Sequence, residues 1–312
     1  MNDKHAKYQR LIDFCKALPP LPTAVAHPCD KSSLEGAVEA AQLGLIAPIL
    51  VGPSARIRDV AQEFSISISD YPLVDAPYSE AAAAEAVQLV REGKVEALMK
   101  GSLHTDELMG AVVKRDSGMR TGRRVSHCFV MDVPGHENAL IITDAAINIA
   151  PTLEEKKDIL QNAIDLAHAL MVPEVRVAVL SAMELVNPKV PSTIDAAALC
   201  KMVDRRQITG ALVDGPLALD NAIDPEAARI KGIDSRVAGR ANVLMVPDLE
   251  AGNMLAKSLS FLAGADAAGI VLGARVPIIL TSRADSAMTR RASCAVAALV
   301  AKARRDAGKA MG

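Results

Sequence analysis

Three side chains with complementary chemistry closely follow one apolar run: Ser282, Arg283 and Asp285. The run at 276–280 is typical of a buried strand and a long helical pattern begins at Ser286, so the cluster lies where a strand ends and a helix begins. A guanidinium can hold phosphate or a developing oxyanion, and a carboxylate can take a proton from a reacting group. Because ligands bind at this edge of a parallel α/β sheet, the segment predicts a site for anionic ligands.

Polar residues follow other predicted strands in the same way. Asp248, Gly252 and Asn253 come after the apolar run 241–245 and lead into a helix, whose first N–H groups could cradle a phosphate. A tight strand-to-helix turn would give the same pattern. Ser102 and Asp214 stand at two further strand ends, each beside a glycine. Strand ends that carry polar residues in this way predict that these residues line one cleft.

The elements that must position these residues alternate along the chain. Short β-rich runs predict strands at 24–27, 48–52, 97–101, 126–133, 139–143, 176–180, 210–214, 243–247, 269–272 and 276–280. Alanine-rich periodic stretches predict helices at 33–43, 54–63, 79–92, 105–113, 152–170, 192–205, 224–231, 252–262 and 286–307. This alternation indicates a parallel sheet with helical crossovers, and the irregular segment 144–151 indicates a domain boundary.

Composition narrows the function classes. With 312 residues, 50% apolar residues and 23% charged residues, the chain is typical of a globular protein with one or two domains. A formal net charge of -2 argues against non-specific nucleic-acid binding. No apolar window reaches the length of a membrane span, and residues 1–16 are too charged for a secretory signal, so a cytoplasmic location is expected. The five cysteines contain no CxxC pair, which favours reduced thiols over disulfides or a zinc site.

A set of motifs in this order resembles the phosphate acetyltransferase and phosphate butyryltransferase family. The motifs are Lys100-Gly101-Ser102-Leu103-His104-Thr105, Met119-Arg120-Thr121-Gly122, Val125-Ser126-His127, Ile142-Thr143-Asp144-Ala145-Ala146-Ile147-Asn148, Ser181-Ala182-Met183-Glu184, Asn187-Pro188, Pro191-Ser192-Thr193, Asp214-Gly215-Pro216, Pro247-Asp248-Leu249-Glu250-Ala251-Gly252-Asn253 and Leu280-Thr281-Ser282-Arg283-Ala284-Asp285-Ser286. Each is weak alone, but together they form a strong signature that runs from Val25 to the end. The chain especially resembles the transferase half of bifunctional enoyl-CoA hydratase/phosphate acetyltransferases.

The resemblance implies a fold class and an activity. The fold class is α/β, with two three-layer α/β/α domains, 1–145 plus 270–312 and 146–269, and an active-site cleft between them. The implied reaction is acyl-CoA plus phosphate to acyl phosphate plus CoA, with a short acyl group such as acetyl or butyryl. Coenzyme A is then a substrate, so no cofactor and no metal are expected. The resemblance also implies a homodimer, whose other partners are small-molecule substrates only.

The resemblance further implies roles for individual residues. Ser282 is assigned to the CoA thiol and Arg283 to the phosphate or oxyanion. The acetyltransferase branch has a catalytic aspartate where this chain has Thr289, so Asp285 is the candidate for the base that takes the thiol proton. A helix cap would explain Asp285 equally well, and Asp248 and Asp214 are the other candidate bases.

The substrate-binding candidates come from the remaining motifs. They are Arg120, Thr121, Ser102, Asp248, Gly252, Asn253 and Asp214. The resemblance implies that Arg120 contacts phosphate, and the alternative is that Arg120 is a solvated loop arginine beside Arg123 and Arg124. Another phosphate-binding arginine of the acetyltransferase branch has no counterpart around Met109, where this chain is apolar.

Two other functions stay open from sequence. A decarboxylating dehydrogenase on a related cleft would need a nicotinamide cofactor and a metal, for which Asp214, Asp220 and Asp224 are the nearby acids. No convincing GxGxxG fingerprint and no P-loop occur. A non-catalytic protein that binds CoA esters or an enoyl-CoA hydratase partner is the other alternative. The preferred acyl group cannot be predicted, because a methylene changes binding by only about 1–3 kcal/mol.

Overall fold

The computed structural model describes residues 6–282 and 285–310, which form two compact units. The terminal unit comprises residues 6–123 together with the described residues from 268 onward, and the middle unit comprises 124–267. The chain therefore leaves the terminal unit, builds the middle unit and returns. The domain boundaries predicted from sequence, at 145 and 270, and the cleft between the domains stay predictions.

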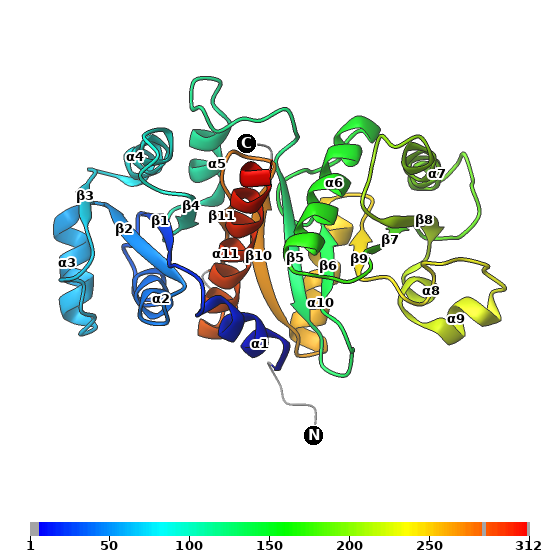
Figure 1. Ribbon diagram of the computed structural model, residues 1–312, viewed down its shortest axis with the longest axis horizontal. Coiled ribbons are helices and arrows are strands. Elements are labelled where there is room, and N and C mark those ends of the chain that lie inside the picture. The colour runs from blue at the N-terminus through cyan, green and yellow to red at the C-terminus, as the bar shows by residue number, and fades with distance from the viewer. Residues whose placement is uncertain (1–5, 283–284, 311–312) are drawn as a thin grey trace. The chain divides into compact units, whose positions relative to one another are not determined.

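The terminal unit is a three-layer α/β/α structure. Its strands follow the order β3-β2-β1-β4-β11-β10, with bounds β1 (Leu21–Ala26), β2 (Ile46–Gly52), β3 (Leu73–Asp75), β4 (Ala97–Lys100), β10 (Asp266–Leu272) and β11 (Ile278–Ile279). The helices are α1 (Ala6–Cys15), α2 (Lys31–Gln42), α3 (Ser54–Glu63), α4 (Ser79–Arg91), α5 (Thr105–Val113) and α11 (Ala287–Ala310). Helices α1 and α2 both pack against α11, while α4 and α5 pack together on the other face (Figure 1).

The middle unit repeats this layering. Its strands follow the order β5-β6-β9-β7-β8, with bounds β5 (Ser126–Asp132), β6 (Leu140–Thr143), β7 (Arg176–Leu180), β8 (Leu212–Leu217) and β9 (Val243–Met245). The helices are α6 (Leu153–Ala169), α7 (Pro191–Asp204), α8 (Leu219–Ile223), α9 (Pro225–Ile230) and α10 (Leu249–Leu262). Helices α6 and α7 pack together on one face, and α8, α9 and α10 cover the other (Figure 1).

The predicted α/β fold is confirmed, but two strand pairs depart from the parallel arrangement that the sequence pattern predicts. Strands β5 and β6 pair antiparallel, and so do β10 and β11. The connections 133–139 and 273–277 are too short for a helical crossover, which needs about a dozen residues or more. Parallel pairs make up the rest of each unit, including β1 with β4 and β4 with β11. Helices α1 and α8 and strand β3 were not predicted.

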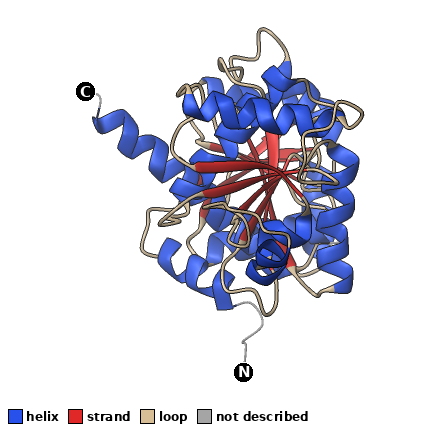
Figure 2. Cartoon of the chain, turned by 90° about the vertical axis from the view of Figure 1, so that its right-hand side faces the viewer, coloured by secondary structure: helices blue, strands red, loops and turns tan. Residues whose placement is uncertain are grey.

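The cores lie between sheet and helices in each unit, and Figure 2 shows the strands enclosed by helices. In the terminal unit the buried strand residues include Val25, Leu50, Leu98, Met99, Ile270 and Ile279. In the middle unit they include Ile142, Ala178, Leu180 and Leu244. Both faces of the central strands are covered, which explains why these runs are almost continuously apolar. None of the helices described in the structure is long and apolar enough to cross a bilayer.

Candidate active site

One edge of the terminal unit collects the ends of three parallel strands. Ala26 of β1 pairs with Lys100 of β4, and Met99 of β4 pairs with Ile279 of β11. The segments that follow these strands therefore leave the sheet at the same edge, and they carry His27, Ser102 and Ser282. The strand register therefore places these three polar residues at one edge of the sheet in the terminal unit.

Close packing of two backbones holds Ser102 at this edge. The Gly101 N–H donates to Ala26 O at 2.9 Å, and the Ser102 N–H donates to His27 O at 2.8 Å. The Ser102 hydroxyl also donates to His27 O at 2.8 Å, lies 3.0 Å from His27 Nδ1 and accepts the Cys29 N–H at 3.3 Å. These contacts tie the end of β4 to the end of β1, so the hydroxyl has a structural role. Its substrate-binding role stays a prediction.

The close approach at Gly101 gives a stability prediction. A Cβ on Gly101 would lie 2.3 Å from Ala26 O and 2.5 Å from His27 O, and these backbone atoms cannot rotate away. We expect Gly101→Ala to lower the free energy of unfolding by at least about 1–3 kcal/mol. Gly110→Ala in α5 is the control, because its Cβ would meet nothing within 4 Å. Urea denaturation of both variants measures the effect, and a wild-type midpoint for Gly101→Ala would contradict it.

Ser282 and Asp285 are joined by reciprocal hydrogen bonds. The Ser282 N–H donates to Asp285 Oδ2 at 2.6 Å, and the Asp285 N–H donates to Ser282 O at 3.2 Å. Asp285 Oδ1 accepts no hydrogen bond from any other residue that the structure describes. One carboxylate oxygen thus fixes the turn, and the other can take a proton. Arg283, the predicted phosphate-binding residue, lies outside the described residues.

The start of α11 is capped by Ser286 and not by Asp285. Ser286 Oγ accepts the Thr289 N–H at 3.1 Å and lies 3.3 Å from Thr289 Oγ1. Thr289 is buried, and its carbonyl accepts the Ser293 hydroxyl at 2.8 Å. Thr289, where the resemblance places the catalytic aspartate of the acetyltransferase branch, is therefore part of the helix cap in this chain. A helix cap does not account for Asp285.

The surroundings of Asp285 set its acidity. Burial raises the pKa of the Asp285 carboxyl above its usual value, while the Ser282 N–H and the positive charges of Arg290 and Lys100 lower it. Lys100 is only 6% exposed, and its Nζ donates to Gly101 O at 3.3 Å. A carboxyl whose pKa is raised by burial is a better proton acceptor than an ordinary surface aspartate.

Arg120 and Thr121 lie at the opposite edge of this sheet. Thr121 Oγ1 donates to Gly273 O at 2.5 Å, and Arg120 forms a β-bridge with Ala274. Because β10 runs antiparallel to β11, Gly273 lies at the edge where β11 begins, whereas Gly269 O accepts the Leu280 N–H near the Ser282 edge. Gly269 and Gly273 are four residue steps apart on an extended strand, a distance of about 13 Å.

The structure therefore does not bring Arg120 and Thr121 together with Ser282. Arg120 is exposed, and its guanidinium makes no hydrogen bond or ion pair with other residues in the described ranges. A guanidinium without a protein partner can bind an anion, so its predicted contact with phosphate stays a prediction.

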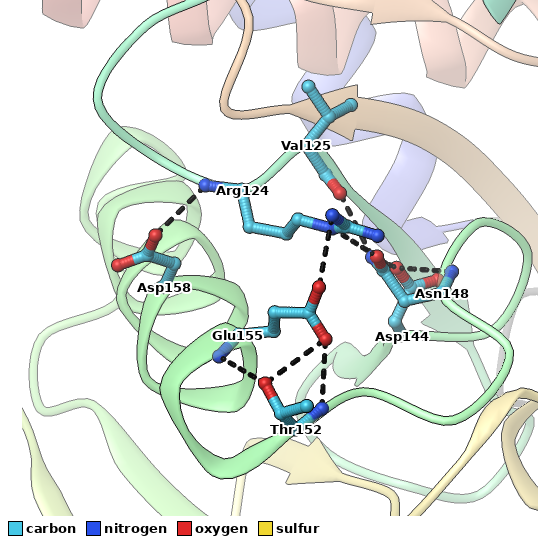
Figure 3. A network of polar contacts seen from close by, with 7 residues as sticks. All are labelled: Arg124, Val125, Asp144, Asn148, Thr152, Glu155 and Asp158. Carbon is cyan, nitrogen blue, oxygen red and sulfur yellow. Dashed lines mark hydrogen bonds and ion pairs between the residues drawn. The ribbon is translucent and has the colours of Figure 1, made fainter.

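In the middle unit, Asp144 organises the loop that follows β6 (Figure 3). Its side chain is buried at 2% exposure and accepts the N–H groups of Ala146 at 2.9 Å, Ile147 at 3.0 Å and Asn148 at 3.3 Å. It also accepts the His127 N–H at 3.2 Å and Asn148 Nδ2 at 2.5 Å. The carboxylate thus satisfies several buried donors at once, which fixes the loop.

Arg124 ties this loop to the start of α6 (Figure 3). Its Nε donates to Asn148 Oδ1 at 2.7 Å, its Nη1 pairs with Glu155 Oε1 at 3.0 Å, and its N–H donates to Asp158 at 2.9 Å. Glu155 also accepts the Thr152 N–H at 2.9 Å in a capping box. Arg124 therefore joins the Asp144 loop to the first turn of α6.

Asp248, Gly252 and Asn253 lie beside the Asp144 loop, at the edge where β6 and the parallel strand β9 end. Asp248 caps α10 by accepting an N–H of its first turn at 2.9 Å. A Cβ on Gly252 would lie 2.7 Å from Asp144 O, so only glycine allows this approach. Asn253 Nδ2 donates to Ala145 O at 3.3 Å. The structure thus brings these three predicted residues together, while their contact with substrate stays a prediction.

The three acids considered for the dehydrogenase alternative each interact with a different partner. Asp214 lies on β8 and accepts the Gly215 N–H at 2.8 Å. Asp220 pairs with Lys231 at 3.0 Å, and Asp224 caps α9. Within residues 6–282 and 285–310, no group of three or more His, Cys, Asp or Glu side chains is arranged to hold a metal ion.

Sequence reasoning missed Lys100, Arg290, Asp144 and Arg124. Lys100 could have been identified from the sequence, because it is a charged residue in an otherwise apolar run. A lysine is rarely buried unless it is paired. Arg290 gave no such signal, because it lies in an ordinary helical pattern and its partners are backbone carbonyls. Asp144 and Arg124 stood in or beside motifs, but their hydrogen bonds depend on the folded loop.

The fold and the Ser282 edge together are those of an α/β protein with polar and charged groups gathered at the end of its parallel strands. A family model described as "Phosphate acetyl/butaryl transferase" matches residues 76–298. The chain belongs to this family. It is an enzyme that transfers acyl groups to or from phosphate, and the resemblance noted from the motifs is confirmed.

Individual relatives agree with the family match. The chain is 66% identical to a phosphate acetyltransferase of Rhizobium meliloti, over 97% of this chain and 96% of the relative. It is 41% identical to a phosphate butyryltransferase of Clostridium beijerinckii, over 94% of this chain and 97% of the relative. A crystal structure of a branched-chain phosphotransacylase from Enterococcus faecalis V583 matches with a TM-score of 0.79 and 29% identity, over 90% of this chain and 99% of that one.

Proposed function

We propose that this phosphate acyltransferase moves an acetyl group between coenzyme A and inorganic phosphate. The observation that supports acetyl is the difference in identity, 66% to an acetyltransferase against 41% to a butyryltransferase. The chemistry is supported by the hydroxyl of Ser282, the carboxyl of Asp285 and the buried cation of Lys100 at one strand edge.

In the proposed reaction, the CoA sulfur attacks the carbonyl carbon of acetyl phosphate. The C–S bond forms, the C–O bond to phosphate breaks, and the thiol proton passes to Asp285 Oδ1. Ser282 binds and orients the thiol, while Arg283 balances the charge that develops on phosphate and on the carbonyl oxygen. A thiol has a pKa of about 8.5, so a base raises the fraction of reactive thiolate at neutral pH.

The remaining properties belong to the same proposal. We expect no metal and no cofactor to be needed, because the charge is held by arginine and lysine side chains and CoA is consumed as a substrate. We also expect a homodimer that works in the cytoplasm and does not bind nucleic acid. Free thiols at all five cysteines support a reducing compartment. Analytical ultracentrifugation tests the dimer, and a monomer at micromolar concentration would contradict it.

The purified protein is expected to form acetyl-CoA from acetyl phosphate and CoA in EDTA as fast as in Mg²⁺. The thioester absorbance follows the product, and butyryl phosphate should react at least about tenfold more slowly because its extra methylenes need a larger pocket. Faster reaction with butyryl phosphate would contradict the acetyl assignment. No thioester from any short acyl phosphate would overturn the proposed function, and dependence on Mg²⁺ with a nicotinamide cofactor would favour a dehydrogenase.

A further inference from the structure

The guanidinium of Arg290 is buried beneath the Ser282–Asp285 turn. Its side chain is 5% exposed; Nη1 donates to Asp285 O at 2.9 Å, and Nη2 donates to Ser282 O at 3.0 Å. One rigid planar group thus holds two carbonyls that flank residues 283 and 284. A lysine could not do the same, because its ammonium is a single point donor.

These contacts act on the same two residues that exchange hydrogen bonds with each other. The Ser282 N–H binds Asp285 Oδ2, the Asp285 N–H binds Ser282 O, and Arg290 engages both carbonyls. The position of the Asp285 carboxylate relative to Ser282 is therefore fixed from two directions. Catalytic groups need such support, because a displacement of about 1 Å can cost 10²-fold in rate.

Helix α2 confines the stem of Arg290 on its other side. A Cβ on Gly36 would lie 2.6 Å from Arg290 Cδ, so the glycine leaves the space that this side chain occupies. The stem of Arg290 thus packs against α2 at the glycine, while its guanidinium binds the turn. Gly36 is itself buried within α2, far from Ser282 in the sequence.

We propose that Arg290 is a positioning residue for acyl transfer. It holds Ser282 and Asp285 in fixed positions relative to each other and does not touch the reacting atoms. This inference rests on the proposed function of the same site. Burying a cation is costly unless it is fully paired, so a purely structural turn would be held more cheaply by neutral groups. The charge has a second effect, since it lowers the pKa of the partly buried Asp285 carboxyl and favours its ionised form.

The test compares Arg290→Met and Arg290→Lys with Arg291→Met. Arg291 is the neighbouring arginine of the same helix, and its Nε binds Ala287 O at 3.2 Å. We expect Arg290→Met to lower kcat about 10- to 100-fold and to move the acid limb of kcat/KM to higher pH. KM for acetyl phosphate and CoA should change little, and Arg290→Lys should recover part of kcat and most of the pH shift. Arg291→Met should behave as wild type.

A second variant perturbs Arg290 without removing it. Gly36→Ala should displace the guanidinium from the turn, lower kcat and shift the acid limb of kcat/KM in the same direction. This variant keeps the inference testable if Arg290→Met does not fold. Gly308→Ala in α11 is its control, because a Cβ there meets nothing within 4 Å. Thermal melting of every variant reports folding separately.

Several results would overturn the inference. If folded Arg290→Met, or Gly36→Ala, keeps the wild-type kcat and pH profile, the turn does not need its contacts with the Arg290 guanidinium. A rise confined to KM for acetyl phosphate would make Arg290 a substrate-binding residue instead. A loss of kcat with lowered melting temperature and an unmoved acid limb would make it structural only. If the wild-type protein forms no thioester, the proposed function itself fails, and the inference fails with it.

Discussion

Replacement of Arg283 with alanine is expected to lower kcat by about 10²-fold or more, the scale of one lost oxyanion donor. In the proposed reaction this guanidinium balances charge that appears only as the C–O bond to phosphate breaks. The loss should therefore fall on kcat more than on KM. Arg283→Lys should recover only part of the rate, because an ammonium lacks the planar fork. Steady-state kinetics with acetyl phosphate and CoA measure the effect.

Two other arginines serve as comparisons for Arg283. Arg305 pairs with Glu96 at 2.8 Å near the start of β4, so Arg305→Ala should leave kcat unchanged. Arg120 lies at the sheet edge opposite Ser282, and its alanine variant tests whether that guanidinium contacts phosphate. If Arg283→Ala keeps near-normal turnover while Arg120→Ala loses it, the roles assigned to the two arginines are reversed.

Replacement of Asp285 with asparagine is expected to lower the rate at least about 10²-fold below neutral pH. Without the base, the reaction depends on thiolate already present, which rises about tenfold per pH unit below the thiol pKa. The variant should therefore approach wild type as the pH nears that of the free thiol. Wild-type kcat/KM should fall when acid protonates Asp285, at a pH above the usual range for an aspartate because burial raises its pKa.

The same pKa shift predicts a change in stability. A carboxyl whose pKa is higher in the folded state binds its proton more tightly when folded, so its favourable contribution is present at low pH and is lost as the pH rises through the folded-state pKa. Asp285→Asn removes the ionised form and keeps an oxygen for the Ser282 N–H. We therefore expect its melting temperature at neutral pH to equal or exceed that of wild type.

The exposed pair Lys201 and Asp204 provides the control for Asp285, since Asp204→Asn should change neither the rate nor its pH profile. A constant ratio of Asp285→Asn to wild-type activity across pH would remove Asp285 as the base. Asp248 and Asp214 would then be tested next, although the first caps α10 and the second binds its neighbouring N–H.

The strand ends could be predicted from sequence because the residues that mark a strand end are neighbours along the chain. Apolar runs bounded by polar or glycine residues mark both the strand and the edge at which it ends, so the residue pattern alone places Ser102 and Ser282 at sheet edges. The short connections before β6 and β11 also contained enough information to predict antiparallel pairing. Asp285 was placed beside Ser282 for the same local reason, although the capping of α11 by Ser286 was missed.

Contacts between distant segments could not be predicted in this way. Arg120 lies opposite Ser282 because its loop bridges to Ala274, a pairing that no periodicity reveals. Arg290 became a candidate only through the contacts of its guanidinium with two carbonyls, with Gly36 leaving room for its stem. Lys100 looked like part of a motif, while its influence on Asp285 depends on the strand order β4-β11.

The order of strands in the terminal unit also bears on how the chain folds during synthesis. Strand β4 pairs with β11, which leaves the ribosome long after β4, when the whole middle unit has already been made. Until then β4 is an unpaired edge, and such an edge can pair with another chain. Helix α1 also cannot make all its native contacts until late in synthesis, because its Tyr8 hydroxyl accepts the N–H of Ala268 in β10 at 2.7 Å. We therefore expect the middle unit to fold first on the ribosome and nascent chains without β11 to depend on chaperones.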